Sequence, residues 1–217
     1  MKTRFGWLRR VALAAVLLLA AALLTIAPDL AKMDLGSLSS REGWQLPDRV
    51  IESLRIQSGE HVADVGAGDG YFTFRLAAAV GPSGRVYAVE VDDERVAELE
   101  RRAREGSHDN VVVVRGEYAD PLLPDGEIDL VLFCNSYHHI EDRVAYLDRL
   151  RSDLADEARV AVIDLKGSLL VRLLAPPGHW TTVETMTQEM EGASYVLAES
   201  FDYLPAQSFV VFRPGPR

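Results

Sequence analysis

Hydrophobic positions form short apolar runs that alternate with amphipathic segments from Leu46 onward. Runs of β-branched and apolar residues predict strands at 61–65, 85–90, 111–114, 128–134, 159–165, 195–200 and 208–212. Helical spacing predicts helices at 48–54, 71–80, 93–105, 142–154 and 181–191, and a Pro/Gly-rich stretch predicts a loop at 120–126. The last two strands are too close for a helical crossover and should pair antiparallel. We therefore expect an α/β, Rossmann-like doubly wound sheet of five parallel strands with a C-terminal antiparallel hairpin.

The chain begins with a basic flank and an uncharged apolar run, residues 11–27, which Pro28 ends. As a helix this run would be about 26 Å long, at the short end of what spans a hydrocarbon core of about 30 Å. We expect an anchor in preference to a cleaved signal peptide, although both remain open, as does the side of the membrane. The predicted domains are therefore a flank, hydrophobic segment and linker at 1–40 and one folded domain at 41–217.

Charge and cysteine content narrow the functional classes. The net charge is -10, and the first 40 residues are basic, so the folded part is more acidic than the whole chain. Such a surface repels phosphate backbones, so we expect no nucleic-acid partner and favour a small or neutral one. The single cysteine, Cys134, excludes an intrachain disulfide and a cysteine-based zinc site.

A glycine-rich loop follows the first predicted strand, at residues 64–70, with the sequence DVGAGDG. Alternating glycines let the backbone approach a ligand closely, and the next helix offers free N–H groups. Glu90 ends the second predicted strand, where a carboxylate can accept both hydroxyls of a ribose. A dinucleotide fingerprint would need a further glycine at position 71, which is Tyr71. The spacing therefore favours a nucleoside ligand without a pyrophosphate.

These segments resemble motifs of the class I S-adenosylmethionine-dependent methyltransferases. Residues 62–73 resemble motif I, 86–92 motif II, 115–118 the adenine-side loop and 125–132 motif IV. The resemblance implies an enzyme with S-adenosyl-L-methionine as its cofactor. The expected cofactor-binding residues are Asp64, Gly66, Ala67, Gly68, Gly70, Glu90, Glu117 and Asn135.

The implied reaction is methyl transfer by in-line displacement to an unidentified small-molecule or lipid acceptor. Such a reaction needs alignment of the acceptor and exclusion of water more than it needs an acid or a base. The alternative is a non-catalytic methyltransferase-like binding or structural domain at or beyond the membrane. Export away from the cytosolic cofactor would favour that alternative.

Candidate catalytic residues follow the fourth predicted strand, at the sheet edge where ligands bind in this class of fold. His138 or His139 could serve as a general base. In the competing interpretation, one histidine lines the cofactor pocket and the other caps the next helix. Catechol-type methyltransferases hold magnesium with carboxylates at the ends of the fourth and fifth strands. Here Asn135 takes the first place and Asp164 is a lone carboxylate at the second, so we expect no metal.

Two further segments are candidates for covering the pocket. Trp44, Gln45 and Pro47 precede the first helix of the domain, where enzymes of this class commonly fold a lid over the cofactor. His179 and Trp180 follow the fifth strand, the usual place for loops that shape the acceptor site. Simple packing or exposure in a loop is the alternative for both segments.

Overall fold

The computed structural model describes residues 10–11, 13–17, 20–21, 40–167 and 178–216. In chain order the elements of residues 40–216 are α2 (Arg41–Gln45), α3 (Pro47–Leu54), β1 (His61–Val65), α4 (Thr73–Val80), β2 (Arg85–Glu90), α5 (Asp93–Glu105), β3 (Val111–Arg115), β4 (Ile128–Cys134), η2 (Tyr137–His139), α6 (Arg143–Leu150), β5 (Leu154–Leu165), α8 (Val183–Gly192), β6 (Tyr195–Phe201) and β7 (Gln207–Pro214). The strands form one seven-stranded sheet in the order β3-β2-β1-β4-β5-β7-β6.

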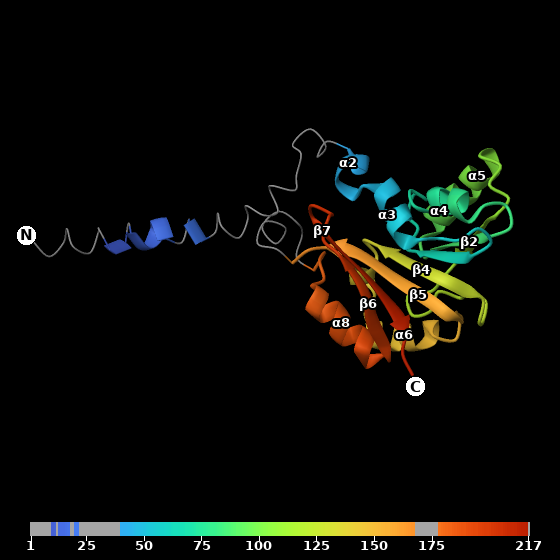
Figure 1. The fold of residues 1–217 in the computed structure, drawn as a ribbon. Coiled ribbons are helices and arrows are strands. Elements are labelled where there is room, and N and C mark those ends of the chain that lie inside the picture. Colours follow the sequence, from blue (N-terminus) through green and yellow to red (C-terminus); the bar gives the residue numbers. More distant parts are fainter. Residues whose placement is uncertain (1–9, 12, 18–19, 22–39, 168–177, 217) are drawn as a thin grey trace, which may run out of the picture.

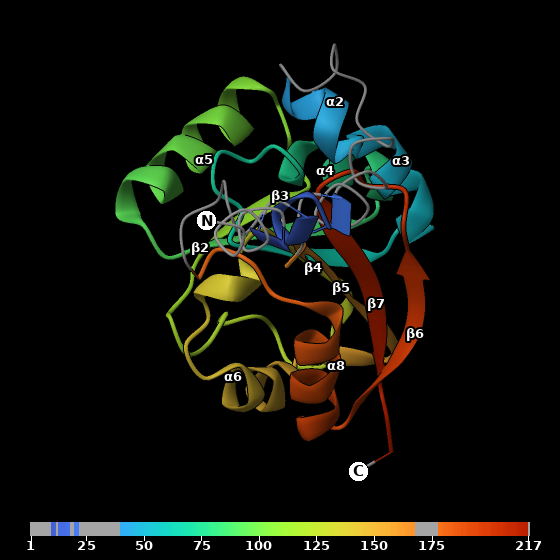
Figure 2. The ribbon, with the colours of Figure 1, turned by 90° about the vertical axis from the view of Figure 1, so that its left-hand side faces the viewer.

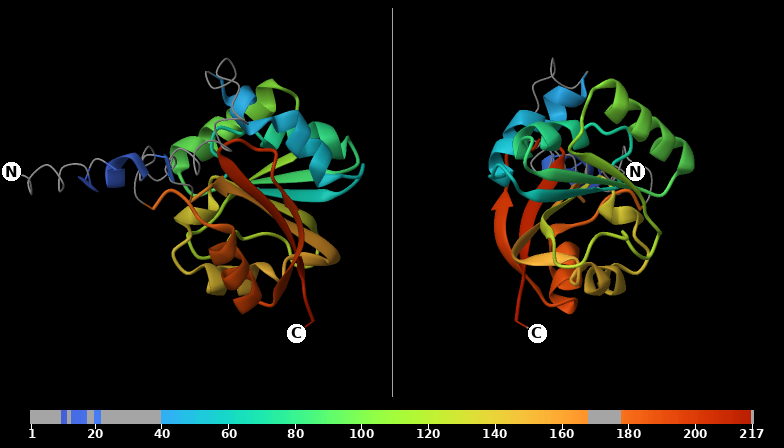
Figure 3. Two further views of the ribbon diagram at one scale, coloured as in Figure 1. Left: turned by 60° about the vertical axis from the view of Figure 1, so that its left-hand side comes forward. Right: turned by 90° about the vertical axis from the view of Figure 1, so that its right-hand side faces the viewer.

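The sheet lies between two layers of helices. Figure 1 shows α2, α3, α4 and α5 on one face of the sheet and α6 and α8 on the other. Figures 2 and 3 show the same two layers from other sides. The central strand β4 supplies both cores, because successive side chains of a strand point to opposite faces. Val131 and Phe133 pack in the core shared with α6 and α8, whereas Leu130 and Leu132 pack in the core shared with α3 and α4.

The predicted topology is confirmed. Pairing is parallel between β1 and β2, β2 and β3, β1 and β4, and β4 and β5. β7 is antiparallel to both β5 and β6, as the short connection between the last two strands requires. The parallel arrangement brings the carboxyl ends of β1, β2 and β4 to one edge, where the predicted ligand-binding residues lie.

Two predicted boundaries in the connection between β4 and β5 were wrong. The helix expected at 142–154 ends at Leu150, and β5 begins at Leu154 instead of Arg159. The segment from Leu154 to Ala158 has a helix-compatible composition, but Leu154 pairs with Ile128 across a register shift in β4. Pairing with a neighbouring strand thus overrides local propensity at this point.

The N-terminal hydrophobic segment is described only in part. Residues 10, 11, 13–17, 20 and 21 are helical, and Leu13, Val16 and Leu17 are each about 60% exposed. The rest of the predicted segment at 11–27 lies outside the described residues. Within the part of the chain that the structure describes, none of the helices has the length and apolar character needed to cross a membrane.

Candidate functional site

The loop from β1 to α4 has the backbone conformation that its glycines predict. Gly66, Gly68 and Gly70 have φ angles of 77°, 59° and 76°, in the left-handed region that favours glycine. A Cβ at Gly66 would stand 2.4 Å from the Cβ of Ser136, because this turn packs against the segment that follows β4. A Cβ at Gly68 would meet only the end of the Arg95 side chain, at 3.1 Å. The segment after β4 therefore packs closely against the loop at Gly66, whereas at Gly68 the space beside the loop is bounded mainly by the flexible end of Arg95.

Glu90, at the end of β2, is bound to this loop through its carboxylate. The main-chain N–H of Gly68 donates to its Oε2 at 2.8 Å, and those of Val91 and Asp92 donate to its Oε1 at 2.8 and 3.2 Å. Only 7% of Glu90 is exposed. These donors hold the carboxylate at the edge of the sheet, beside the glycine loop.

A pocket of about 410 Å³ lies at this edge of the sheet. Five of the predicted site residues line it: Gly66, Glu90, Glu117, Asn135 and His139. Its wall also contains residues that the sequence analysis did not single out, namely Val65, Val91, Arg95, Tyr118, Phe133, Ser136, Ile140 and Tyr146. Hydrophobic side chains at the carboxyl ends of strands form part of this wall, so an adenine ring could pack there.

Asp64 lies beneath the loop and not on the pocket wall. It is 3% exposed, and the Thr73 hydroxyl donates to its Oδ2 at 2.7 Å. Burial raises the pKa of Asp64 to about 6, and the Thr73 hydrogen bond and the Arg41 charge oppose that rise. Asp64 therefore ties the end of β1 to the start of α4. The predicted residues Ala67, Gly68, Gly70 and His138 are likewise absent from the described wall of the pocket.

Asn135 begins the sharp turn after β4, with a φ of 55°. Its Oδ1 accepts a hydrogen bond of 2.8 Å from the side chain of Gln207, at the start of β7. Asp164, the second residue considered for a cation, accepts hydrogen bonds from His138 instead. The two residues thus have separate protein partners.

The predicted catalytic histidines lie in η2, and their environments differ. Nδ1 of His138 is 2.7 Å from Oδ1 of the fully buried Asp164, and the His138 side chain is 4% exposed. His139 is exposed and lines the pocket. Burial of its ring and the neighbouring His138 and His179 lower the pKa of His139, which favours its neutral form. His139 is thus the histidine that can meet a ligand directly.

The turn that carries these histidines is fixed from α6 and α8. The hydroxyl of the fully buried Tyr137 donates to Oε2 of Glu189 at 3.0 Å, and Arg143 donates to Oε1 of the same carboxylate at 2.7 Å. Nε of Arg143 also donates to the carbonyl of Tyr137 at 3.1 Å. Three side chains from three elements therefore determine where His138 and His139 stand.

The predicted lid residues lie within helices and do not precede the first one. Trp44 and Gln45 lie in the short helix α2, beside the glycine loop, and Pro47 begins α3. Arg41 makes an ion pair with Asp69 at 3.0 Å, and Gln45 is buried with its amide 3.4 Å from the Cys134 thiol. Burial raises the pKa of the Cys134 thiol, and this residue packs against the core between the sheet and α3 and α4. Trp44 is half-buried. α2 is thus attached to the same edge of the sheet as the pocket.

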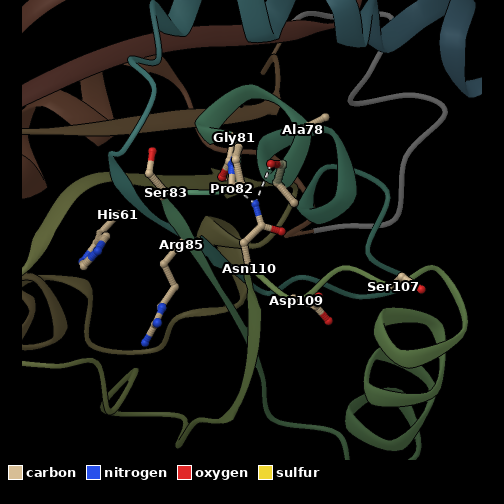
Figure 4. Close-up of a pocket in the computed structure, with 11 residues that line it drawn as sticks. His61, Ala78, Gly81, Pro82, Ser83, Arg85, Ser107, Asp109 and Asn110 are labelled. Carbon is tan, nitrogen blue, oxygen red and sulfur yellow. Dashed lines mark hydrogen bonds between the residues drawn. The ribbon is translucent and has the colours of Figure 1, made fainter.

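A second pocket, of about 570 Å³, lies at the opposite edge, near the amino ends of β1, β2 and β3. Figure 4 shows Asn110 bridging this pocket, and its side chain donates to the carbonyls of Ala77 and Gly81 at 2.8 and 3.0 Å. Those bonds join the end of α4 to the start of β3. This pocket is larger than the one beside the glycine loop. The hydrogen bonds of Asn110 at this pocket hold two elements of the fold together, and we assign the pocket no ligand.

Comparison with known proteins agrees with this geometry. The methyltransferase domain family matches residues 62–157, which include the glycine loop, Glu90, Glu117 and the histidine turn. A solved structure of an S-adenosylmethionine-dependent methyltransferase from Aquifex aeolicus superposes with a TM-score of 0.73 at 24% identity. That match covers 81% of this chain and 94% of the other.

Two curated relatives are similar over shorter stretches. A demethylmenaquinone methyltransferase from Geobacillus sp. (strain WCH70) is 23% identical over 62% of this chain and 57% of its own length. A protein-L-isoaspartate O-methyltransferase from Ignicoccus hospitalis is 33% identical over 38% of this chain and 39% of its own length. The chain therefore spans less than two thirds of either relative. Residues 62–157 thus match a methyltransferase domain, for which the family indicates S-adenosylmethionine as the cofactor, and the fold of the chain is that of a solved S-adenosylmethionine-dependent methyltransferase.

Proposed function

We propose that this protein transfers a methyl group from S-adenosylmethionine to a small-molecule or lipid acceptor by in-line displacement. The observation that carries the proposal is the convergence of Gly66, Glu90 and Glu117 on one pocket at the carboxyl edge of the sheet. Gly66 belongs to the predicted glycine loop, Glu90 is the predicted ribose contact, and Glu117 is the predicted adenine contact. Bound cofactor supplies a methyl group that its sulfonium already activates, so the chain must mainly orient the acceptor and exclude water.

Each proposed cofactor contact uses a group with suitable chemistry. The Glu90 carboxylate has about four acceptor sites. Three of them accept main-chain N–H groups, and the remaining site on Oε2 can accept a ribose hydroxyl. Glu117 is exposed on the loop after β3, where its carboxylate can accept from the adenine amine. Gly66 and Asn135 also line the pocket. Asp64 supports the loop from beneath, and Ala67, Gly68 and Gly70 are part of the loop itself.

The acceptor side is proposed to be the histidine turn. His139 lines the pocket, so it is the residue placed to take a proton from an acceptor that must lose one. His138 is a positioning residue in this proposal, because its ring is bound to Asp164 and its side chain is buried. The curated relatives are named for a quinone precursor and for a protein residue, so similarity to them does not select an acceptor.

Calorimetric titration of the full chain with S-adenosylmethionine tests the cofactor assignment. We expect one-to-one binding that Gly68→Arg abolishes, because the larger side chain would fill the open side of the loop. Gly126→Arg is the matched control, since Gly126 also has a positive φ, of 71°, and no heavy atom lies within 4 Å of its added Cβ. Absence of binding to the unmodified chain would refute the proposal. Binding without methyl transfer to any component of a membrane extract would favour the non-catalytic alternative.

We further propose that the N-terminal segment at 11–27 associates with a membrane. The basic flank, the uncharged run and the exposed side chains of Leu13, Val16 and Leu17 support this proposal. Replacing these three residues with serine should move the full chain from the membrane to the soluble fraction of a cell extract. A chain that fractionates identically before and after the replacement would contradict the assignment.

A further inference from the structure

Three histidines from two separate segments meet beside the pocket. His138 and His139 come from η2, and His179 comes from the segment between β5 and α8. One ring nitrogen from each can be chosen so that all three lie within 4.8 Å of one another. The ring centroids of His138 and His139 are 4.1 Å apart, and His179 is 5.3 and 5.6 Å from them. Imidazole nitrogens gathered in this way are the preferred ligands of several divalent transition metals.

His138 has the orientation of a metal ligand supported by a carboxylate. Its Nδ1 is 2.7 Å from Oδ1 of the fully buried Asp164. Because the carboxylate accepts, Nδ1 carries the hydrogen and the lone pair of the neutral ring is on Nε2. That Nε2 is buried and has no hydrogen-bond partner among the residues that the structure describes. A buried acceptor without a partner is unfavourable, and a bound cation would satisfy it.

We propose that Nε2 of His138, together with His139 and His179, binds one divalent transition-metal ion, with zinc as the best match. Three histidines are a known ligand set for zinc, and they leave the fourth tetrahedral position open. The Asp164–His138 pair matches the carboxylate that commonly orients a metal-bound histidine. Two nitrogens on one tetrahedral zinc stand about 3.3 Å apart, given Zn–N distances of about 2.0–2.1 Å. The side chain of His139 is exposed and that of His179 is at least partly exposed, so rotation of these two rings can bring their nitrogens from within 4.8 Å to this separation.

The location of such an ion gives it a role in binding the methyl acceptor. This role rests on the proposed function, whereas binding of the ion does not. Because His139 also lines the pocket, the ion would lie at its wall, with its open position available to an oxygen of the acceptor. A cation there favours a hydroxyl or carboxylate acceptor and lowers the pKa of a bound hydroxyl. His139 would then act as a ligand, and the ion would replace it as the group that activates the acceptor.

Zinc binding to the purified, metal-free full chain tests the site without any methyl transfer. We expect calorimetric titration with zinc sulfate to show one equivalent bound, and cobalt(II) to give the visible absorption of a tetrahedral complex. His179→Ala should weaken zinc binding at least tenfold, and Asp164→Asn by about 10–100-fold, through loss of the supporting carboxylate. Zinc should raise the melting temperature of the unmodified chain and leave that of His179→Ala unchanged.

The two remaining histidines provide matched controls. His61 and His108 lie elsewhere in the fold, so His61→Ala and His108→Ala should bind zinc as the unmodified chain does. The proposal is overturned if no equivalent of zinc binds, or if binding survives in His179→Ala and in His138→Ala. Equal loss of binding in the control variants would also overturn it. Failure of zinc binding would leave the titration with S-adenosylmethionine unaffected, so the two proposals fail separately.

Discussion

The main-chain N–H of Gly68 donates a 2.8 Å hydrogen bond to Oε2 of Glu90, joining the glycine loop to the end of the neighbouring strand. The loop lies between β1 and α4, and Glu90 ends β2, which pairs in parallel with β1. The pairing places the two residues at one edge although 22 positions separate them in the chain. Loop conformation and the position of the proposed ribose-binding carboxylate are therefore coupled.

Glu90→Gln should weaken S-adenosylmethionine binding about ten- to hundredfold. Glutamine has a single acceptor oxygen, so it cannot accept from Gly68 and from Val91 and Asp92 together. It also loses the carboxylate charge, and hydrogen bonds to a charged group contribute about 1.5–3 kcal/mol against about 0.5–1.5 kcal/mol for neutral ones. Calorimetric titration measures the change in dissociation constant. Glu100→Gln, on the exposed face of α5, is the control and should bind as the unmodified chain does. Equal affinities of the Glu90 variant and the unmodified chain would contradict the ribose assignment.

Gly66→Ala should lower stability and abolish cofactor binding together. The added Cβ would stand 2.4 Å from the Cβ of Ser136, so the turn after β4 would have to move away from the loop. Gly126→Ala imposes a similar left-handed strain, on the order of 1–2 kcal/mol, with free space around the new Cβ. Thermal unfolding and cofactor titration should show lower stability for both variants and lost binding for Gly66→Ala alone. Intact binding in the Gly66 variant would show that the close approach to Ser136 is not required.

The stability of the protein relative to Asp64→Asn should decrease as the pH rises. Burial raises the pKa of Asp64 in the folded state from 3.8 to about 6. A carboxyl with a raised folded-state pKa contributes stability that is fully present below the unfolded pKa and is lost as the pH rises through the folded one. The difference between the two proteins should therefore change by up to about 3 kcal/mol between pH 4 and pH 7. Denaturant unfolding at several pH values measures it.

An exposed aspartate provides the comparison for that experiment. Asp109→Asn, near the start of β3, should shift the pH dependence little because Asp109 is exposed. Burial also raises the pKa of Asp153 to about 6. Asp153 is present in every variant, so its contribution cancels when the free energies of unfolding of the variants are subtracted. A pH-independent difference between Asp64→Asn and the unmodified chain would contradict the assigned shift.

Arg143→Ala should lower the free energy of unfolding by about 1–3 kcal/mol. The substitution removes the donors to Glu189 and to the carbonyl of Tyr137, and it leaves a partly buried carboxylate with a single hydrogen-bonded partner among the described side chains. Arg149→Ala, on the same helix, removes exposed hydrogen bonds to main-chain carbonyls and should cost less than about 1 kcal/mol. Denaturant unfolding compares the two variants. Equal effects would mean that the histidine turn does not depend on Arg143.

The pattern of residues determined most of the fold. The runs at 61–65, 85–90 and 128–134 are apolar, short and bounded by turn residues, and they form strands with those bounds. The glycine spacing likewise predicted a loop after the first strand, and Gly66, Gly68 and Gly70 adopt positive φ angles there, which glycine takes without strain. Local chemistry of this kind is encoded in neighbouring residues and can be interpreted from them.

Contacts between distant segments were decided only by the tertiary structure. Leu154 joins β5 because it pairs with Ile128, and its own neighbours give no sign of that pairing. The residue pattern indicated only that His179 lies in a loop that could shape the acceptor site, and it pointed to no metal ligands beyond Asn135 and Asp164. The fold brings His179 to within 5.3 Å of His138, ring centre to ring centre, although 41 positions separate them in the chain. Such proximity depends on how β5 and α8 pack against η2, and packing of this kind leaves no periodic signal in the chain.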